Sequence, residues 1–168
     1  MVLYGTTHRV GDGVGADAII APELRGAGDP AVLAAYCLAS ADPGIAEAAR
    51  EGDVLLAGAG FGAGDDPEPA VLALQAAGFA AIVCAGADAG FAAAAASYGL
   101  PVLECPAALS IAAGRVVRLD LLAGTIADRA TGAVFHTTPC PPELVAAARR
   151  AQLLARMRRV ADEEGFDG

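Results

Sequence analysis

A glycine-rich segment, residues 58–64, leads directly into a predicted helix start that carries three carboxylates. These are Asp65, Asp66 and Glu68. A glycine-rich turn before a helix is a common anion site, because the first helical amides are unpaired and the helix dipole is positive there. Here the side chains at that position are negative, and Pro67 and Pro69 each lack a backbone N–H. The segment therefore combines the backbone of an anion site with side chains that repel an anion.

The pattern places Asp66 at the N-cap, Pro67 at the first helical position and Pro69 at the third. Two of the first three helical amides would then be missing. Two unit charges 4 Å apart interact by about 4 kcal/mol at an effective dielectric near 20. That is a large part of the roughly 8 kcal/mol that corresponds to micromolar binding. We therefore expect this loop to disfavour a substrate carboxylate.

A carboxylate at Asp65 is a legitimate general base, so the loop remains a candidate catalytic site. A cation site formed by Asp65, Asp66 and Glu68 is a less favoured alternative, because acidic residues at a helix start are usually caps and dipole partners. His8 and His136 have no serine or cysteine partner at a recognisable spacing, which argues against a catalytic dyad. We predict that His8 is a structural residue of the first strand.

Short apolar strands alternate with helices through the first two thirds of the chain. The expected strands are residues 1–10, 53–57, 80–84 and 100–104. The expected helices are residues 29–39, 42–51, 67–77 and 88–98. This alternation predicts a parallel sheet covered by helices.

The last third of the chain differs in pattern. Tight turns separate three short segments that are expected to form antiparallel strands, at residues 116–120, 125–127 and 133–136. A final helix is expected over residues 141–160, with Leu144, Leu153, Leu154 and Met157 on its apolar side. Its arginines predict a solvated face, and an acidic partner surface is the alternative.

Length and charge limit the classes of protein. The chain has 168 residues, enough for one domain, and residues 161–168 are expected to form a flexible acidic tail. Its formal net charge of -9 argues against a nucleic-acid partner. No apolar run reaches the roughly 18 residues of a membrane-spanning helix. The composition therefore predicts a soluble, cytoplasmic protein with no membrane association.

The four cysteines are Cys37, Cys84, Cys105 and Cys140. None forms a CxxC pair, and no histidine lies at zinc-like spacing. We therefore expect buried free thiols, with no metal and no cofactor bound by this chain.

Several landmarks occur in order along nearly the whole chain and carry a resemblance. They are His8 with Gly11-Asp12, Asp17-Ala18-Ile19-Ile20, Asp29-Pro30, Tyr36-Cys37, Gly52-Asp53, Ala57-Gly58, Phe61-Gly62, Gly64 and Gly99-Leu100-Pro101. With these residues the chain resembles the small subunit of 3-isopropylmalate dehydratase and homoaconitase, the separate swivel domain of the aconitase superfamily. The resemblance implies an α/β fold: a single swivelling β/β/α domain with a mixed parallel core sheet, covering helices and a short antiparallel region.

The resemblance also implies where a site would lie. The family loop Gly-Ser-Ser-Arg-Glu falls on residues 64–68 of this chain, so Asp65 occupies the position of the serine base and Pro67 that of the substrate-binding arginine. The substrate-recognition loop is matched only by Leu24-Arg25-Gly26. The implied substrate-binding residues are therefore Arg25, Gly62, Gly64 and Asp66.

By the same resemblance, the chain would bind a large subunit that carries a [4Fe–4S] cluster, in a heterodimer or heterotetramer. The pair would isomerise a hydroxy acid by dehydration and rehydration, as in leucine biosynthesis, and this chain would be inactive alone. The alternative is a diverged, catalytically silent swivel domain that acts as a structural or regulatory partner. A homo-oligomer of the isolated chain also remains open.

Overall fold

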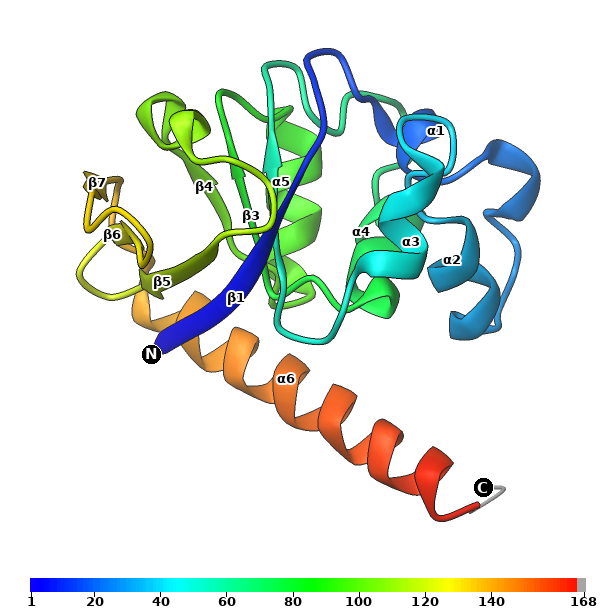
Figure 1. Ribbon diagram of the computed structural model, residues 1–168. Helices are drawn as coiled ribbons and strands as arrows, with labels where there is room; N and C mark the ends of the chain where they lie inside the picture. The colour runs from blue at the N-terminus through cyan, green and yellow to red at the C-terminus, as the bar shows by residue number, and fades with distance from the viewer. Residues whose placement is uncertain (166–168) are drawn as a thin grey trace.

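The computed structural model describes residues 1–165 and shows one seven-stranded mixed sheet with helices packed against it (Figure 1). The strands lie in the order β4-β3-β2-β1-β5-β6-β7. The predicted parallel and antiparallel regions are therefore two halves of a single sheet, and they meet at the first strand. This arrangement confirms the predicted α/β class.

Strand β1 (Val2–Arg9) belongs to both halves because different parts of it pair with different neighbours. Residues 7–9 pair in parallel with β2 (Val54–Ala57), and residues 2–6 pair antiparallel with β5 (Val116–Asp120). The parallel half continues through β3 (Ala81–Cys84) to β4 (Val102–Glu104). The carboxyl ends of β1 to β4 therefore lie at the same edge of the sheet.

The antiparallel half is a meander of β5, β6 (Thr125–Asp128) and β7 (Val134–His136). The sheet curls so that its two ends meet. Thr137 Oγ1 donates a hydrogen bond to the carbonyl of Glu104 at 3.0 Å, and Cys105 Sγ donates one to the carbonyl of His136 at 3.4 Å.

Five helices cover one face of the parallel half. They are α1 (Ala16–Ile19), α2 (Pro30–Tyr36), α3 (Pro43–Ala48), α4 (Glu68–Ala77) and α5 (Ala89–Ser97). Asp29 and Asp42 cap α2 and α3, as their Asp-Pro pairs predict. Helix α1 was not predicted, nor were the 3₁₀ turns at Pro22–Leu24 and Pro106–Ser110.

Two hydrophobic cores lie on opposite faces of the sheet. Leu55, Ile82 and the side chains of Phe61 and Phe91 belong to the core beneath α1–α5. Val54, Leu56 and Val83 belong to the other core, which the 106–110 turn and the start of the last helix close. Strands β2 and β3 are buried on both faces, which explains their uninterrupted apolar sequences.

The last helix, α6 (Pro142–Glu163), is three residues longer than predicted at its carboxyl end, so the predicted tail is helical as far as Glu163. Residues 166–168 of that tail lie outside the described part of the chain. Its apolar side also differs from the prediction. Leu144 packs against the core, whereas Leu153, Leu154 and Met157 face solvent. Within residues 1–165, none of the helices has the length and apolarity needed to cross a bilayer.

Candidate active-site loop at the carboxyl edge of the sheet

Three loops meet at the carboxyl edge of the parallel half, following β1, β2 and β3. They are residues 10–15, residues 58–67 and residues 85–88. The β2 loop lies between the other two because β2 lies between β1 and β3 in the sheet. Binding sites of open parallel sheets commonly form at this edge.

Backbone hydrogen bonds join the β1 loop to the β2 loop. The amides of Gly13 and Gly62 donate to the carbonyls of Ala59 and Val14, each at 2.8 Å. The carboxylate of Asp12 accepts the amide of Ala59 at 2.8 Å. This role of Asp12 was not predicted from the sequence, where Asp12 was only a landmark of the resemblance. Its position directly after a strand is the signal that could have indicated a contact with the neighbouring loop.

The β3 loop holds the other side of the β2 loop. The amide of Phe61 donates to the carbonyl of Gly86 at 3.1 Å, and the amide of Asp88 donates to the carbonyl of Phe61 at 2.9 Å. The ring of Phe61 packs edge-on against Phe91 of α5, with the ring centroids 5.2 Å apart. We call residues 58–64 the frame. The β1 loop and the β3 loop hold the frame on its two sides, and the contact between Phe61 and Phe91 anchors it to α5.

Two glycines of the frame have backbone angles and close neighbours that disfavour any residue with a Cβ atom. Gly62 has a φ of 79°, and a Cβ atom there would lie 2.2 Å from Cγ of Phe91. Gly64 has a φ of 153°, and a Cβ atom there would lie 3.1 Å from Cβ of Ala16. The predicted site residues Gly62 and Gly64 thus shape the loop, and the amide of Gly62 already donates to Val14.

Residues 65–68, which we call the tip, project beyond the frame. Asp65, Asp66 and Glu68 are all exposed. The hydroxyl of Tyr98 donates to Glu68 Oε2 at 3.4 Å, a contact that the sequence did not indicate. The predicted base Asp65 and the predicted binding residue Asp66 are consecutive residues of the tip.

The predicted N-cap of the following helix is wrong. Pro67, with αR dihedral angles, is the N-cap of α4, and no side chain caps this helix. A cap at Asp66 would have only the amide of Glu68 to accept among the first three helical positions, because Pro67 and Pro69 have no N–H. The carbonyl of Pro67 instead accepts the amide of Val71 at 3.1 Å. The amide of Glu68 therefore stands at the first helical position, followed by Pro69.

Arg25, the predicted recognition residue, lies at the end of the 3₁₀ turn after α1 and forms an ion pair with Asp17 through its Nη2. Its Nε is buried and has no hydrogen-bond partner among residues 1–165. Asp17 follows Ala16, whose amide donates to the carbonyl of Ala63 in the frame at 2.8 Å. The structure thus links Arg25 to the frame through α1, with its charge paired to a carboxylate.

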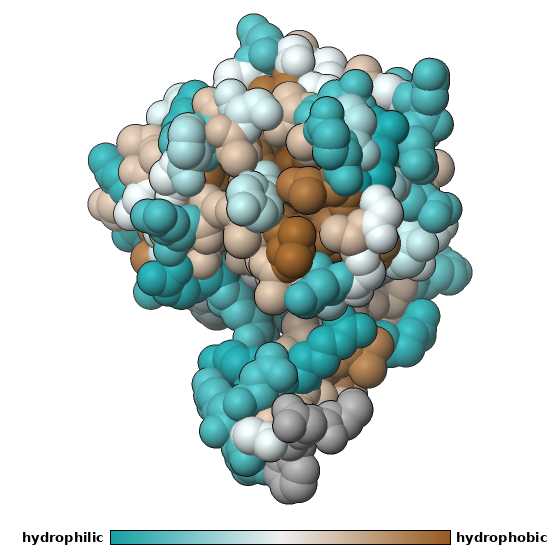
Figure 2. Space-filling model, turned by 90° about the vertical axis from the view of Figure 1, so that its right-hand side faces the viewer, coloured by the Kyte–Doolittle hydropathy of each residue, from teal (hydrophilic) through white to brown (hydrophobic). Residues whose placement is uncertain are grey.

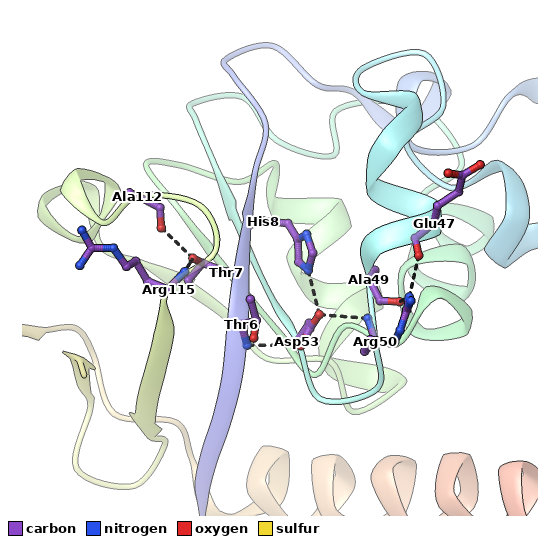
Figure 3. Close-up of polar contacts among 9 residues, drawn as sticks. All are labelled: Thr6, Thr7, His8, Glu47, Ala49, Arg50, Asp53, Ala112 and Arg115. Carbon is purple, nitrogen blue, oxygen red and sulfur yellow. Dashed lines mark hydrogen bonds and ion pairs between the residues drawn. The ribbon is translucent and has the colours of Figure 1, made fainter. Parts of the chain in front are cut away.

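His8 lies on β1 and faces α3 (Figure 3). Its Nε2 donates to Oδ2 of the buried Asp53 at 2.8 Å, and its ring packs edge-on against Phe79 at a centroid distance of 5.8 Å. Asp53 also accepts the amides of Arg50 at 2.9 Å and Thr6 at 3.3 Å. These contacts tie β1 to the turn before β2, which supports a structural role for His8.

The four cysteines are buried free thiols, Cys37 and Cys84 in the core beneath α1–α5 and Cys105 and Cys140 in the core on the other face of the sheet. Burial raises the pKa of the Cys37 thiol to about 12, and burial together with the negative charge of Glu104 raises that of Cys84 to about 11. Protonated thiols do not ligate iron or zinc. Residues 1–165 also contain no group of three or more histidine, cysteine or carboxylate side chains that could hold a metal ion.

The candidate loop lies on an open surface. Two hollows of the molecule, of about 270 Å³ and 210 Å³, lie elsewhere. The larger one lies between β4 and residues 137–141, and the smaller one between His8 and α3. A substrate at the tip would therefore need a second surface to enclose it.

Known proteins share this architecture and sequence over nearly their whole length. The small subunit of 3-isopropylmalate dehydratase from Moorella thermoacetica is 37% identical over 160 residues, covering 93% of this chain and 96% of that protein. The 2,3-dimethylmalate dehydratase small subunit of Eubacterium barkeri is 33% identical over 142 residues, covering 84% of this chain and 87% of that protein. No protein-family profile matches the sequence.

The crystal structure of a 3-isopropylmalate dehydratase from Methanocaldococcus jannaschii superposes with a TM-score of 0.82 at 29% sequence identity. The match covers 97% of this chain and 99% of that one. Agreement in sequence and in three dimensions over the full length confirms the fold that the resemblance implied. The chain therefore belongs to the family of 3-isopropylmalate dehydratase-type small subunits, the small subunits of hydro-lyases.

Proposed function

We propose that this chain completes the active site of a hydro-lyase that removes water from a substituted malate and adds it back. One observation carries the proposal: in a chain that matches dehydratase small subunits end to end, the 58–68 loop stands open at the carboxyl edge of the sheet. An open half-site fits a subunit that needs a partner surface. We further propose that residues 1–168 form one domain.

We assign Asp65 the role of general base. Its carboxylate is exposed on the tip, at the end of a frame that hydrogen bonds fix on both sides. In the dehydration direction it accepts the proton from the carbon that becomes part of the double bond, while the adjacent carbon loses its hydroxyl group as hydroxide, which a Lewis acid or a proton donor of the large subunit would take up. In the hydration direction the protonated carboxyl returns the proton.

The negative charge of the tip determines how the substrate can lie. Asp65 and Asp66 oppose a carboxylate at short range, and the cation of Arg25 is paired with Asp17. We therefore propose that the large subunit holds the substrate carboxylates and that this chain contributes proton transfer. Gly62 and Gly64 set the loop conformation, and Asp66 and Arg25 contact substrate only at the edge of the site.

The iron–sulfur cluster that the resemblance implies belongs to the large subunit in this proposal. The thiols of this chain are buried on two opposite faces of the sheet and do not fit a cluster. The cluster would supply a Lewis acid for the leaving hydroxyl, and this chain would supply the base.

The identity of the substrate is proposed from the names of the relatives. We propose 3-isopropylmalate as the substrate, hence a role in leucine biosynthesis, with the complex located in the cytoplasm. The second hypothesis, a catalytically silent partner, is not favoured, because a relative that is 37% identical over 93% of this chain is a subunit named for dehydratase activity.

The experiment is an anaerobic reconstitution. The tagged chain is used to isolate its partner from its own cells, and the eluate is assayed for isomerisation of isopropylmalate, dimethylmalate and homocitrate. The expected result is a complex with a large subunit that is active on one substituted malate. A stable complex without activity on any of the three, when the same large subunit is active with a small subunit that has Gly-Ser-Ser-Arg-Glu, would overturn the proposal.

A further inference from the structure

Strand β4 is an edge strand of the sheet, so only one of its sides pairs with a neighbouring strand. Pro101 and Cys105 each share a backbone hydrogen bond of 2.9 Å with β3, and the parallel register continues between them. Alternate residues of a strand direct their backbone groups to opposite sides. Val102 and Glu104 therefore direct their amides and carbonyls away from β3, toward the open edge.

Most of these outward backbone groups have no partner. The carbonyl of Glu104 accepts the hydroxyl of Thr137 at 3.0 Å. Among residues 1–165, the amides of Val102 and Glu104 and the carbonyl of Val102 make no hydrogen bond. The amides of Thr137 and Cys140, which lie across from β4, donate at 2.9 Å and 2.8 Å to the turn between β5 and β6. The segment opposite β4 is therefore paired with the antiparallel half and leaves the edge open.

A hollow of about 270 Å³ lies along this edge. Val102, Leu103 and Glu104 line it on the β4 side, and residues 137–141 and Leu144 of α6 line it on the other side. Leu103 and Leu144 contribute to the core on one face of the sheet, whereas Val102 packs against the core beneath α1–α5. Apolar side chains therefore border the hollow toward both faces of the sheet, and the outward backbone of β4 lies between them.

Helix α6 closes only one end of the hollow, through Leu144. The first turns of the helix pack on the body, where Val145 is buried. Its later turns expose Leu153 and Leu154, and Figure 2 shows this part of the helix standing away from the body. At the other end of the hollow Glu104 is exposed, so the edge of β4 can be reached from solvent.

We propose that the hollow receives an extended segment of the large subunit, which adds a strand to the sheet beside β4. The segment accepts hydrogen bonds from the amides of Val102 and Glu104 and donates one to the carbonyl of Val102. Its side chains alternate between the two faces of the sheet, so apolar residues at successive positions meet the apolar borders of the hollow. This inference rests on the proposed function and names a contact through which the two subunits associate.

The position of the hollow selects the large subunit as its occupant. Glu104 stands at the carboxyl end of β4, and its Oε1 accepts the amide of Ala87 at 3.2 Å. Ala87 belongs to the β3 loop and forms a parallel bridge with Phe61 of the frame. The hollow therefore adjoins the carboxyl edge of the sheet, which the large subunit covers in the proposed function.

Hydrogen exchange resolved to single amides tests the inference, on the whole chain alone and on the complex that the tagged chain recovers from its own cells. In the isolated chain, the outward amides of Val102 and Glu104 should exchange at least about 100-fold faster than the amide of Leu103, which faces β3. In the complex, the two outward amides should exchange at least about tenfold more slowly than in the isolated chain. The amide of Leu103 should change little.

A backbone variant gives the second readout. Val102→Pro removes the outward N–H, and an edge strand accepts proline at such a position. We expect the dissociation constant of the complex to rise at least about fivefold. Val102→Ala, which trims the same side chain but keeps the N–H, is the matched control and should leave it within about twofold. Slow exchange of the Leu103 amide in each variant confirms that β4 is still paired.

The outcomes separate this inference from the proposed function. An active complex whose outward β4 amides exchange as fast as in the isolated chain, or equal effects of Val102→Pro and Val102→Ala, would overturn this inference alone. Protected amides in a complex without activity would support the edge contact and count against the proposed function. Protection that grows with the concentration of the isolated chain would assign the edge to a second copy and overturn the large subunit as occupant. Recovery of no large subunit would overturn both.

Discussion

The frame, residues 58–64, and the tip, residues 65–68, are adjacent in the chain but differ in how the structure constrains them. Phe61 and Gly62 are buried, and their backbone amides donate to two neighbouring loops. Asp65 and Asp66 are exposed on an open surface. The frame is determined by packing inside this chain, whereas the chemistry of the tip depends on what binds against it.

This difference explains how the chain keeps the family fold with an altered loop. A substitution in the frame must satisfy backbone geometry and the contact with Phe91, so few residues are acceptable. A substitution at the tip meets solvent in the isolated chain and costs little stability. The fold therefore tolerates changes at the tip, and under the proposed function such changes alter substrate binding and catalysis.

The largest effect is expected for Gly62→Ala. The new methyl group would collide with the Phe91 ring, and alanine would have to adopt a φ of 79°. We expect a loss of about 3 kcal/mol or more in the free energy of unfolding, measured by urea denaturation. Gly60→Ala is the matched control, because Gly60 has a φ of 72° but no atom closer than 3.9 Å. It should lose only about 1 kcal/mol; equal losses would contradict a packed frame.

The core beneath the frame should weaken at alkaline pH. Burial raises the pKa of Cys37 to about 12 in the folded chain from an ordinary value of 9.0. The unfolded thiol therefore loses its proton first, so this contribution is complete below pH 9 and is lost as pH rises toward 12. We expect the free energy of unfolding to fall by about 1.4 kcal/mol per pH unit in that window. Cys37→Ala should show a shallower decline, and an unchanged slope would show that the thiol is not sealed from water.

A smaller effect is expected where the frame is held by one side chain. Asp12→Ala removes the carboxylate that accepts the amide of Ala59. Because this contact lies near the surface, water can replace it, and we expect a loss of about 1 kcal/mol in thermal or urea unfolding. Asp17→Ala, which removes a partly exposed ion pair with Arg25, serves as a comparison and should cost less.

The smallest change in stability is expected at the tip. Asp66→Asn should leave the free energy of unfolding within about 0.5 kcal/mol of the parent value, because Asp66 is exposed and does not cap α4. In the reconstituted complex the same variant should lower KM for a malate-type substrate, since one repulsive charge is removed. A destabilised Asp66→Asn would mean that the tip, like the frame, is part of the folded core.

Much of the fold could be predicted because its signals are local. The doubly buried strands β2 and β3 show as apolar runs, and the Asp-Pro pairs at residues 29 and 42 marked two helix starts. The sequence did not indicate helix α1, which has only four residues. The predicted packing of α6 was also wrong, because helical periodicity identifies an apolar face without showing whether that face contacts the core or solvent.

The place of the candidate loop between a strand and a helix could be predicted from the sequence, whereas its contacts could not. The glycines marked the frame, whereas the pairing of Arg25 with Asp17 depends on how α1 folds back. The predicted cap at Asp66 was wrong: the N-cap of α4 is Pro67, and the two prolines leave only one N–H, that of Glu68, for an aspartate cap to accept. Contacts between segments distant in the chain, such as Asp12 with Ala59, require the three-dimensional fold.

The central claim is that Asp65 is the base of a hydro-lyase, and kcat of the anaerobically reconstituted complex tests it most directly. We expect Asp65→Ala to lower kcat at least about 100-fold while the complex with the large subunit still forms, since general-base catalysis typically contributes that much. Asp66→Ala should retain kcat within a few-fold. An Asp65→Ala complex with unchanged kcat would contradict the account.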